Sequence, residues 1–249
     1  SDLMSDWLDA QSQNVFTAYS TSHVVALLIF IMLFMMLFVC RQWLQDKRRG
    51  DVIRYTLAAI LVLCELTLNI WYVSEGIYDV SSTLPLELCT ISLYMCIVML
   101  LWRSRAIFQI VYFTGIGGAL QALFTPVLYY DFPHFRFLEF FVAHIAIILA
   151  VLYMVWVEGF RPTWKSIAIT MGFLNVLAAI VFTVNTFTGG NYMFVSRKPE
   201  TASLLDFLGL HPWYLLSLEI VAVALFLLLY MPFALKRPKQ ILQQRNIDR

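Results

Sequence analysis

Two residues in this sequence could act together as a nucleophile and a base. Cys89 and His144 lie in two different apolar stretches of the chain. A thiolate is a strong nucleophile, and a neighbouring imidazole both accepts its proton and stabilises the anion that results. Such a pair would suit nucleophilic catalysis. The simpler interpretation is that the cysteine is only a small apolar residue of the core.

Other polar residues fall at a similar depth when each is counted from the end of its apolar stretch. At about 1.5 Å per residue, most lie within about 3 to 14 Å of the same boundary. Ionisable groups in hydrocarbon cost about 2.5 to 3.5 kcal/mol each, and they usually face the bundle interior or a wet cavity. We therefore predict a polar cavity on one side of the bilayer. Its supporting residues are His23, Glu65, Asn69, Gln121, Asn185 and Glu219.

Helical spacing allows the cysteine and the histidine to face this cavity. Arg136, Phe140 and His144 are four residues apart and share one helix face. Pro85 favours the first position of a helix, so the helix of Cys89 is expected to begin there. Cys89 would then lie beyond the first turn, where the helix dipole adds little. We therefore expect the histidine to activate the thiol.

The composition shows which kind of molecule must position these groups. Apolar residues make up 61% of the chain and charged residues 13%, with a mean hydropathy of +0.76. Soluble domains carry about 45–50% apolar residues and about 25% charged residues, so a soluble globular protein is excluded. A disordered chain is excluded as well, because disordered chains have a low apolar content. The net charge of +1 gives no argument for a nucleic-acid partner. The four cysteines lie within or at the ends of apolar runs, so a disulfide scaffold is excluded. We also predict that the protein uses no cofactor.

Seven apolar stretches could each cross a bilayer core, which needs about 20 residues for about 30 Å. All of the 17 lysines and arginines fall on one side of these stretches except Arg136, Arg197 and Lys198. The positive-inside rule then places the N-terminus outside and the C-terminus in the cytoplasm. We predict an all-α integral membrane protein that forms one domain over 1–249. Its predicted helices cover 19–41, 53–73, 83–102, 106–128, 135–157, 164–187 and 211–235.

The last outer connection, 188–210, is longer than a simple connector needs. Two glycines, Gly189 and Gly190, are followed by apolar and aromatic residues, including 192–194 and 202–208. Loops of this length are commonly lids or disordered segments, and this one is too apolar to float freely in water. We predict a partly folded extracellular cap on the membrane face. An ordinary loop with interfacial aromatic residues is the alternative.

Several motifs are spread over nearly the whole chain, at 84–89 (LPLELC), 115–126 (GIGGALQALFTP), 132–136 (FPHFR), 143–144 (AH), 189–194 (GGNYMF) and 212–214 (PWY). Together they resemble those of the YwaF-type bacterial membrane proteins. That family is similar to eukaryotic transmembrane protein 164, an acyltransferase that remodels ether phospholipids, and more remotely to the androgen-induced membrane hydrolases. The resemblance implies a catalytic pair on Cys89 and His144, a phospholipid or lysophospholipid partner, and a bacterial plasma membrane. Because the hydrolases use Thr in place of Cys, Cys89 favours the transferase.

Two functions of different class suit the same cavity. In the first, the protein is a lipid acyltransferase or lipid ester hydrolase in which Cys89 attacks an ester and His144 is general base and then acid. Glu65, Gln121 or Glu219 would orient the histidine or stabilise the oxyanion. In the second, the protein is a transporter or receptor-like binding protein that holds an amphiphile or a cation and breaks no bond.

A third possibility is a zinc hydrolase that uses His23, His144, Cys89 and a glutamate as ligands. These residues lie on separate predicted helices and have no spacing signature of a zinc site. We therefore predict no metal. Nothing in the sequence sets the oligomeric state.

Overall fold

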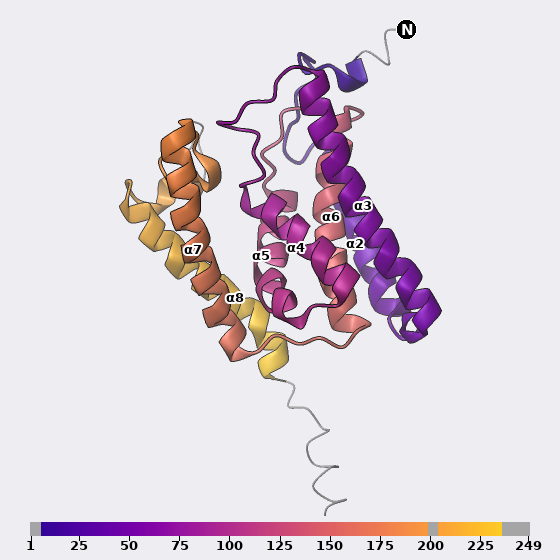
Figure 1. The fold of residues 1–249 in the computed structure, drawn as a ribbon. Coiled ribbons are helices and arrows are strands. Elements are labelled where there is room, and N and C mark those ends of the chain that lie inside the picture. Colours follow the sequence, from indigo (N-terminus) through magenta and orange to yellow (C-terminus); the bar gives the residue numbers. More distant parts are fainter. Residues whose placement is uncertain (1–5, 199–203, 236–249) are drawn as a thin grey trace, which may run out of the picture.

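The structure is a computed structural model that describes residues 6–198 and 204–235, and its long helices form one bundle (Figure 1). Short 3-10 helices, η1 (Trp43–Gln45), η2 (Tyr192–Phe194) and η3 (Leu204–Leu208), lie in the connections. The long helices are α2 (Thr21–Cys40), α3 (Lys47–Ser74), α4 (Leu88–Trp102), α5 (Arg105–Phe124), α6 (Phe135–Trp156), α7 (Trp164–Thr188) and α8 (Trp213–Ala234).

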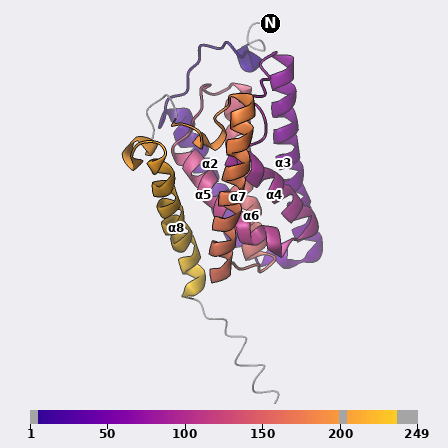
Figure 2. The ribbon, with the colours of Figure 1, turned by 60° about the vertical axis from the view of Figure 1, so that its left-hand side comes forward.

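Helix α6 lies at the centre of the bundle and packs against α2, α3, α4 and α5. Ala143, Ala146 and Ala150 are buried on α6 at a spacing that lets neighbouring helices approach closely. On α5, a Cβ added to Gly115 would lie 3.3 Å from Ile147 of α6, so α5 also packs closely on α6 at this glycine. Helices α7 and α8 lie outside the other helices (Figure 2) and pack against α5. Few of their residues are buried.

Six helices of the described chain are long and apolar enough to cross a bilayer: α2, α3, α5, α6, α7 and α8. Helix α4 is apolar but has only 15 residues, fewer than a crossing usually needs. A helix satisfies all of its own backbone groups, which is what a hydrocarbon solvent requires. The chain is therefore an all-helical, multi-pass membrane protein.

Two helix ends differ from the prediction for local reasons. Helix α3 begins at Lys47 and not at 53, because the side chain of Asp46 caps it by accepting a hydrogen bond from the backbone N–H of Arg49. Helix α5 ends at Phe124 and not at 128, because Pro126 has no N–H with which to continue the helix. The ends of α2, α6, α7 and α8 agree with the predicted ranges to within two residues.

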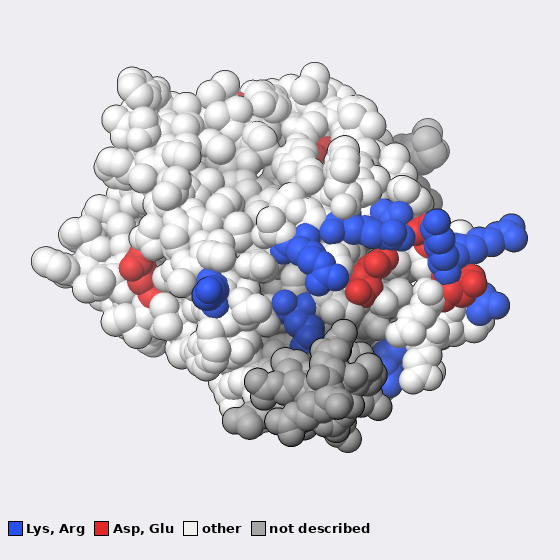
Figure 3. All heavy atoms as spheres, turned by 60° about the horizontal axis from the view of Figure 1, so that its bottom comes forward, with Lys and Arg blue, Asp and Glu red and all other residues white. Residues whose placement is uncertain are grey.

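Lysines and arginines gather at one end of the bundle, which we call the basic end (Figure 3). The opposite end, the loop end, holds the connections 75–87 and 125–134 and the described residues 189–198 and 204–212. The predicted charge asymmetry is therefore present in the described helices and their connections. The basic residues after α8 that the prediction also counted lie outside the described residues: Lys236, Arg237, Lys239, Arg245 and Arg249.

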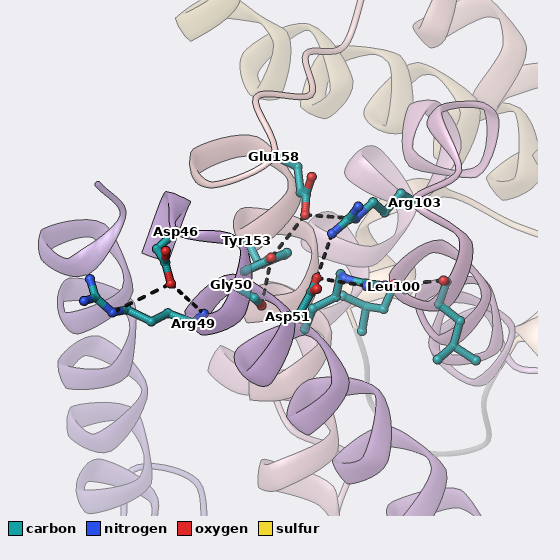
Figure 4. Close-up of polar contacts among 10 residues, drawn as sticks. Asp46, Arg49, Gly50, Asp51, Leu100, Arg103, Tyr153 and Glu158 are labelled. Carbon is teal, nitrogen blue, oxygen red and sulfur yellow. Dashed lines mark hydrogen bonds and ion pairs between the residues drawn. The ribbon is translucent and has the colours of Figure 1, made fainter. Parts of the chain in front are cut away.

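A network of ion pairs fastens the basic end (Figure 4). The guanidinium of Arg103 lies 2.7 Å from Asp51 on α3 and 3.2 Å from Glu158, just after α6. Arg54 lies 3.1 Å from the same Asp51 and donates to the carbonyl of Leu100. These contacts join α3, α4 and α6, so the network holds the three helices together where each meets the basic end.

Candidate active site

Helix α4 begins at Leu88, so Cys89 is its second residue. The predicted range of 83–102 began five residues too early, and the prediction that Cys89 lies beyond the first turn was wrong. The residue before a proline disfavours the helical conformation, and the N–H of Leu84 instead donates to the hydroxyl of Tyr192, at 2.9 Å. Residues 75–87 therefore run as an irregular segment to a helix start that lies below the end of α3 (Figure 1).

The first turn of α4 presents backbone N–H groups without acceptors. Glu87 is the N-cap residue, and its side chain makes no cap hydrogen bond. The first backbone bond at this end runs from the N–H of Ile91 to the carbonyl of Glu87. Within the described chain, the N–H groups of Leu88, Cys89 and Thr90 have no hydrogen-bond acceptor. Free N–H groups at a helix N-terminus stabilise nearby negative charge, whether a thiolate or an oxyanion.

The thiol of Cys89 faces a glycine on α5. Cys89 is half-buried, and a Cβ added to Gly118 would lie 3.4 Å from its sulfur. One turn further along α4, the hydroxyl of Ser92 donates to that of Thr114 on α5, at 3.2 Å. The two contacts show that this face of α4 packs on α5.

His144 on α6 is held in the tautomer of a general base. Its Nδ1 lies 2.6 Å from the carbonyl oxygen of Phe140, so Nδ1 carries the hydrogen and donates it. The neutral ring then has its lone pair on Nε2. Over the residues that the structure describes, Nε2 has no hydrogen-bond partner, and the half-buried ring lies tilted against that of Phe140, with the ring centroids 4.3 Å apart.

The thiol and the imidazole lie at the same height along the bundle. Gly115 of α5 contacts Ile147 of α6, and both Gly118 and His144 lie three residues from that contact toward the loop end, which is about 4.5 Å. Cys89 lies beside Gly118. Cys89 and His144 therefore lie at about the same level along the bundle, and no hydrogen bond joins their side chains in the described part of the chain.

A buried carboxylate cluster lies between α3, α4 and α6. Glu65 accepts hydrogen bonds from the hydroxyl of Tyr94 at 2.9 Å and from the amide of Asn69 at 3.0 Å. On α6, Glu139 is buried and pairs with Arg136 one turn away. Glu139 also interacts electrostatically with Glu65. Sequence reasoning identified Glu65 and Asn69 but missed Glu139, whose only signal is its i, i+3 spacing from an arginine.

Two of the predicted cavity residues are hydrogen-bonded to backbone atoms outside their own helices. His23 is fully buried, accepts the N–H of Tyr19 at 2.8 Å, and donates from Nε2 to the carbonyl of Leu123 at 2.7 Å. Asn185 accepts the N–H of Tyr192 at 2.8 Å and donates to its carbonyl at 3.2 Å. Both side chains therefore fasten the fold, and the structure does not bring them to Cys89.

The structure does not bring Gln121 and Glu219 into the carboxylate cluster. Gln121 is exposed on α5, and Glu219 is half-buried on α8, which packs on α5 and α7 rather than on α3 or α6. Neither side chain makes a hydrogen bond to another described residue. A role for either one in orienting the histidine stays a prediction.

The connection after α7 is fastened over the start of α4. The hydroxyl of Tyr192 donates to the carbonyl of Val80 at 2.6 Å, and the N–H of Met193 donates to Glu87 at 3.2 Å. Gly190 lies so close to Ser81 that an added Cβ would be 2.3 Å from its carbonyl oxygen. Between these segments lies a cavity of about 300 Å³, which we call the loop-end pocket. Its lining residues are Ser81, Ser82, Glu87, Gly189, Gly190, Asn191, Tyr192 and Arg197.

The described residues contain no group of three or more His, Cys, Asp and Glu side chains that could hold a metal ion. Both ring nitrogens of His23 are already occupied by backbone groups. The residues considered for a zinc site are therefore not assembled into a ligand set in this part of the chain.

Comparison with known proteins identifies the family. The model of the TMEM164 family matches residues 18–230, which is most of the chain. This match agrees with the resemblance to transmembrane protein 164 that the motifs indicated. No curated protein and no solved structure matches the chain. On the extent of the family match, the chain belongs to the TMEM164 family.

Proposed function

We propose that this protein is a lipid acyltransferase or lipid ester hydrolase of the bacterial plasma membrane, with Cys89 as nucleophile and His144 as general base. The observation that carries the proposal is the position of Cys89 in the first turn of α4, among backbone N–H groups that lack acceptors. The same N–H groups can stabilise the thiolate before attack and the oxyanion after it. A cysteine that served only as an apolar residue would not need this setting.

The reaction divides into two acyl transfers. Nε2 of His144 takes the proton of the thiol, and the sulfur attacks the carbonyl carbon of a lipid ester. The C–O bond then breaks, the alkoxide leaves with the proton from the imidazolium, and a thioester remains on Cys89. In the second half, the histidine deprotonates the hydroxyl of a lysophospholipid or of water, which attacks the thioester and releases the thiol.

The charge distribution supports an outward-facing site. The positive-inside rule assigns the basic end to the cytoplasm, and the loop end then lies outside. Helix α4, together with the irregular segment before it, completes a seventh crossing. Cys89 would then meet lipids of the outer leaflet, at the depth where their ester groups lie.

An acyl-exchange assay in liposomes tests the proposal. We expect Cys89→Ala to lower transfer of a labelled acyl chain between phospholipids at least 1,000-fold. Cys40→Ala is the matched control. Cys40, the last residue of α2, is a half-buried thiol like Cys89, but it lies at the basic end of the bundle. Full activity of Cys89→Ala, or equal loss in both variants, would overturn the proposal.

A second candidate rests on the carboxylate cluster. Glu65 and Glu139 are both buried, and Arg136 forms an ion pair with Glu139. A transporter or receptor-like protein for an amphiphile or a cation could use such a site without breaking a bond. Uptake into proteoliposomes that is retained by Cys89→Ala and lost in Glu139→Gln would favour this function over acyl transfer.

A further inference from the structure

The loop-end pocket has two opposite charges that do not pair with each other. Glu87 and Arg197 both line the cavity of about 300 Å³, and no ion pair joins them in the described chain. One carboxylate oxygen of Glu87 accepts the N–H of Met193, and its other oxygen has no partner among the described residues. The hydroxyls of Ser81 and Ser82 and the amide of Asn191 line the same cavity. The pocket is therefore polar and presents both a cationic and an anionic group.

We propose that the loop-end pocket binds a zwitterionic phosphoamine, the headgroup of an amine-bearing phospholipid. Glu87 receives the ammonium group, and Arg197 with the serine hydroxyls receives the phosphate. Charge-assisted hydrogen bonds of this kind are about twice as strong as neutral ones, which suits a site that must select a headgroup. The inference deepens the proposed function and rests on it for the identity of the lipid.

The position of the pocket agrees with the chemistry proposed below it. Glu87 is the N-cap residue of α4, and Cys89 follows two residues later, about 3 Å further along the helix axis. In a phospholipid, only the glycerol backbone separates the phosphate from the ester carbonyls. A headgroup held at Glu87 would therefore present its esters to the first turn of α4, where the thiol and the free N–H groups lie.

The walls of the pocket are built closely enough to discriminate between headgroups. Tyr192 is 2% exposed and binds backbone atoms of both Val80 and Leu84. Gly190 has no room for a side chain against Ser81. Two segments far apart in the sequence are thus locked together, so the pocket is shaped before a ligand arrives.

Binding to the Cys89→Ala protein tests the pocket without requiring activity. The variant is placed in nanodiscs with equal amounts of phosphatidylethanolamine and phosphatidylglycerol, and retained lipid is measured by native mass spectrometry. The two lipids share the phosphate and differ in the amine. We expect at least tenfold preference for the amine lipid. Glu87→Gln should abolish the preference, and Arg197→Ala should weaken retention of both lipids at least fivefold.

Matched controls separate a pocket effect from a general loss of charge. Glu75→Gln and Lys198→Ala change charged residues of the loop end that do not line the pocket, and both should retain the tenfold preference. Thermal unfolding of each variant shows that it is folded. Unchanged lipid preference in Glu87→Gln and Arg197→Ala, with both folded, would overturn the proposal.

Soluble glycerophosphoethanolamine distinguishes a lipid from a free phosphoamine as the ligand. We expect it to compete only weakly, at millimolar concentration, because the acyl chains of the lipid also bind. Equal competition by the soluble compound and the lipid would contradict the lipid assignment. The experiment is independent of the thiol: a lipid preference that depends on Glu87, together with full acyl transfer by Cys89→Ala, would refute the proposed catalysis and leave the pocket assigned.

Discussion

The two ends of this bundle handle polar groups in opposite ways. At the basic end, Asp51 pairs with both Arg54 and Arg103, and Glu158 pairs with Arg103, so the charged groups are paired with one another, although Nε of Arg54 is buried without a hydrogen-bond partner among the described residues. Toward the loop end, Nε2 of His144 and the first-turn N–H groups of α4 have no partner in the described chain. A polar network that satisfies itself stabilises the fold. Polar groups without partners, held at one level, indicate a place where a ligand completes the set.

The largest expected effect is a loss of acyl transfer on replacing His144, which lies toward the loop end. His144→Ala should lower acyl transfer about 100- to 10,000-fold, which is the usual contribution of a general base. The variant should unfold at nearly the wild-type temperature, because the ring makes one hydrogen bond within its own helix. The exposed His211 gives a control, and His211→Gln should keep most of the activity. Equal rates in wild type and His144→Ala would remove the histidine from the mechanism.

A pair of glycines sharpens the comparison. A Cβ at Gly190 would lie 2.3 Å from the carbonyl oxygen of Ser81, and one at Gly50 would lie 2.6 Å from that of Leu44. Each Gly→Ala change forces backbone apart, at a cost of about 1 to 3 kcal/mol in the free energy of unfolding. Gly190→Ala should also lower lipid retention, because it opens the loop-end pocket.

Gly50→Ala should destabilise the protein without changing the rate per folded molecule. Thermal unfolding and acyl exchange, measured on both variants, make the comparison. If the two variants lost activity to the same extent at equal folded fraction, the functional difference between the two ends would not hold.

A smaller effect is expected from the basic-end network. Arg54 is buried and donates to the carbonyl of Leu100, so Arg54→Gln leaves a backbone acceptor without its partner. The expected loss is about 1 kcal/mol in the free energy of unfolding. Acyl transfer per folded molecule should not change. A selective loss of activity with unchanged stability would show that the basic end takes part in the reaction.

The smallest expected effect concerns pH at the loop end. His134 precedes α6, and burial lowers its pKa from the ordinary value of 6.5. Its Nδ1 accepts the N–H of Arg136, and its Nε2 donates to the carbonyl of Asp9, so the neutral ring fits the fold. The unfolded chain therefore binds the proton first as pH falls below 6.5, and the folded protein loses stability over that range.

Thermal unfolding between pH 7.5 and about 5.5 measures this effect. His134→Gln keeps a side chain that can bond the same backbone groups but does not titrate, so its unfolding temperature should depend less on pH over that range. An identical pH dependence in wild type and His134→Gln would assign the acid sensitivity to other groups.

The local sequence was enough to predict most helix ends, but it could not predict which groups the polar side chains bind. Apolar stretches of about 20 residues must cross a bilayer, so most helix ends could be predicted. The start of α4 could not be predicted, because the hydroxyl of Tyr192, distant in the chain, takes the N–H of Leu84. Depth alone also grouped His23 and Asn185 with the site, although both bind backbone atoms of other segments. Depth shows where a polar group lies but not what it bonds.

The most direct test of the central claim is to look for the acyl group on the protein. Wild-type protein is mixed briefly with a phospholipid, quenched in acid and digested, and the peptides that contain Cys89, Cys96 and Cys40 are analysed by mass spectrometry. The account predicts a thioester on Cys89 alone, one that accumulates when no acceptor lipid is present and disappears when lysophospholipid is added. An enzyme that turns over lipid with no acyl group on Cys89, or with the acyl group on another residue, would contradict the account.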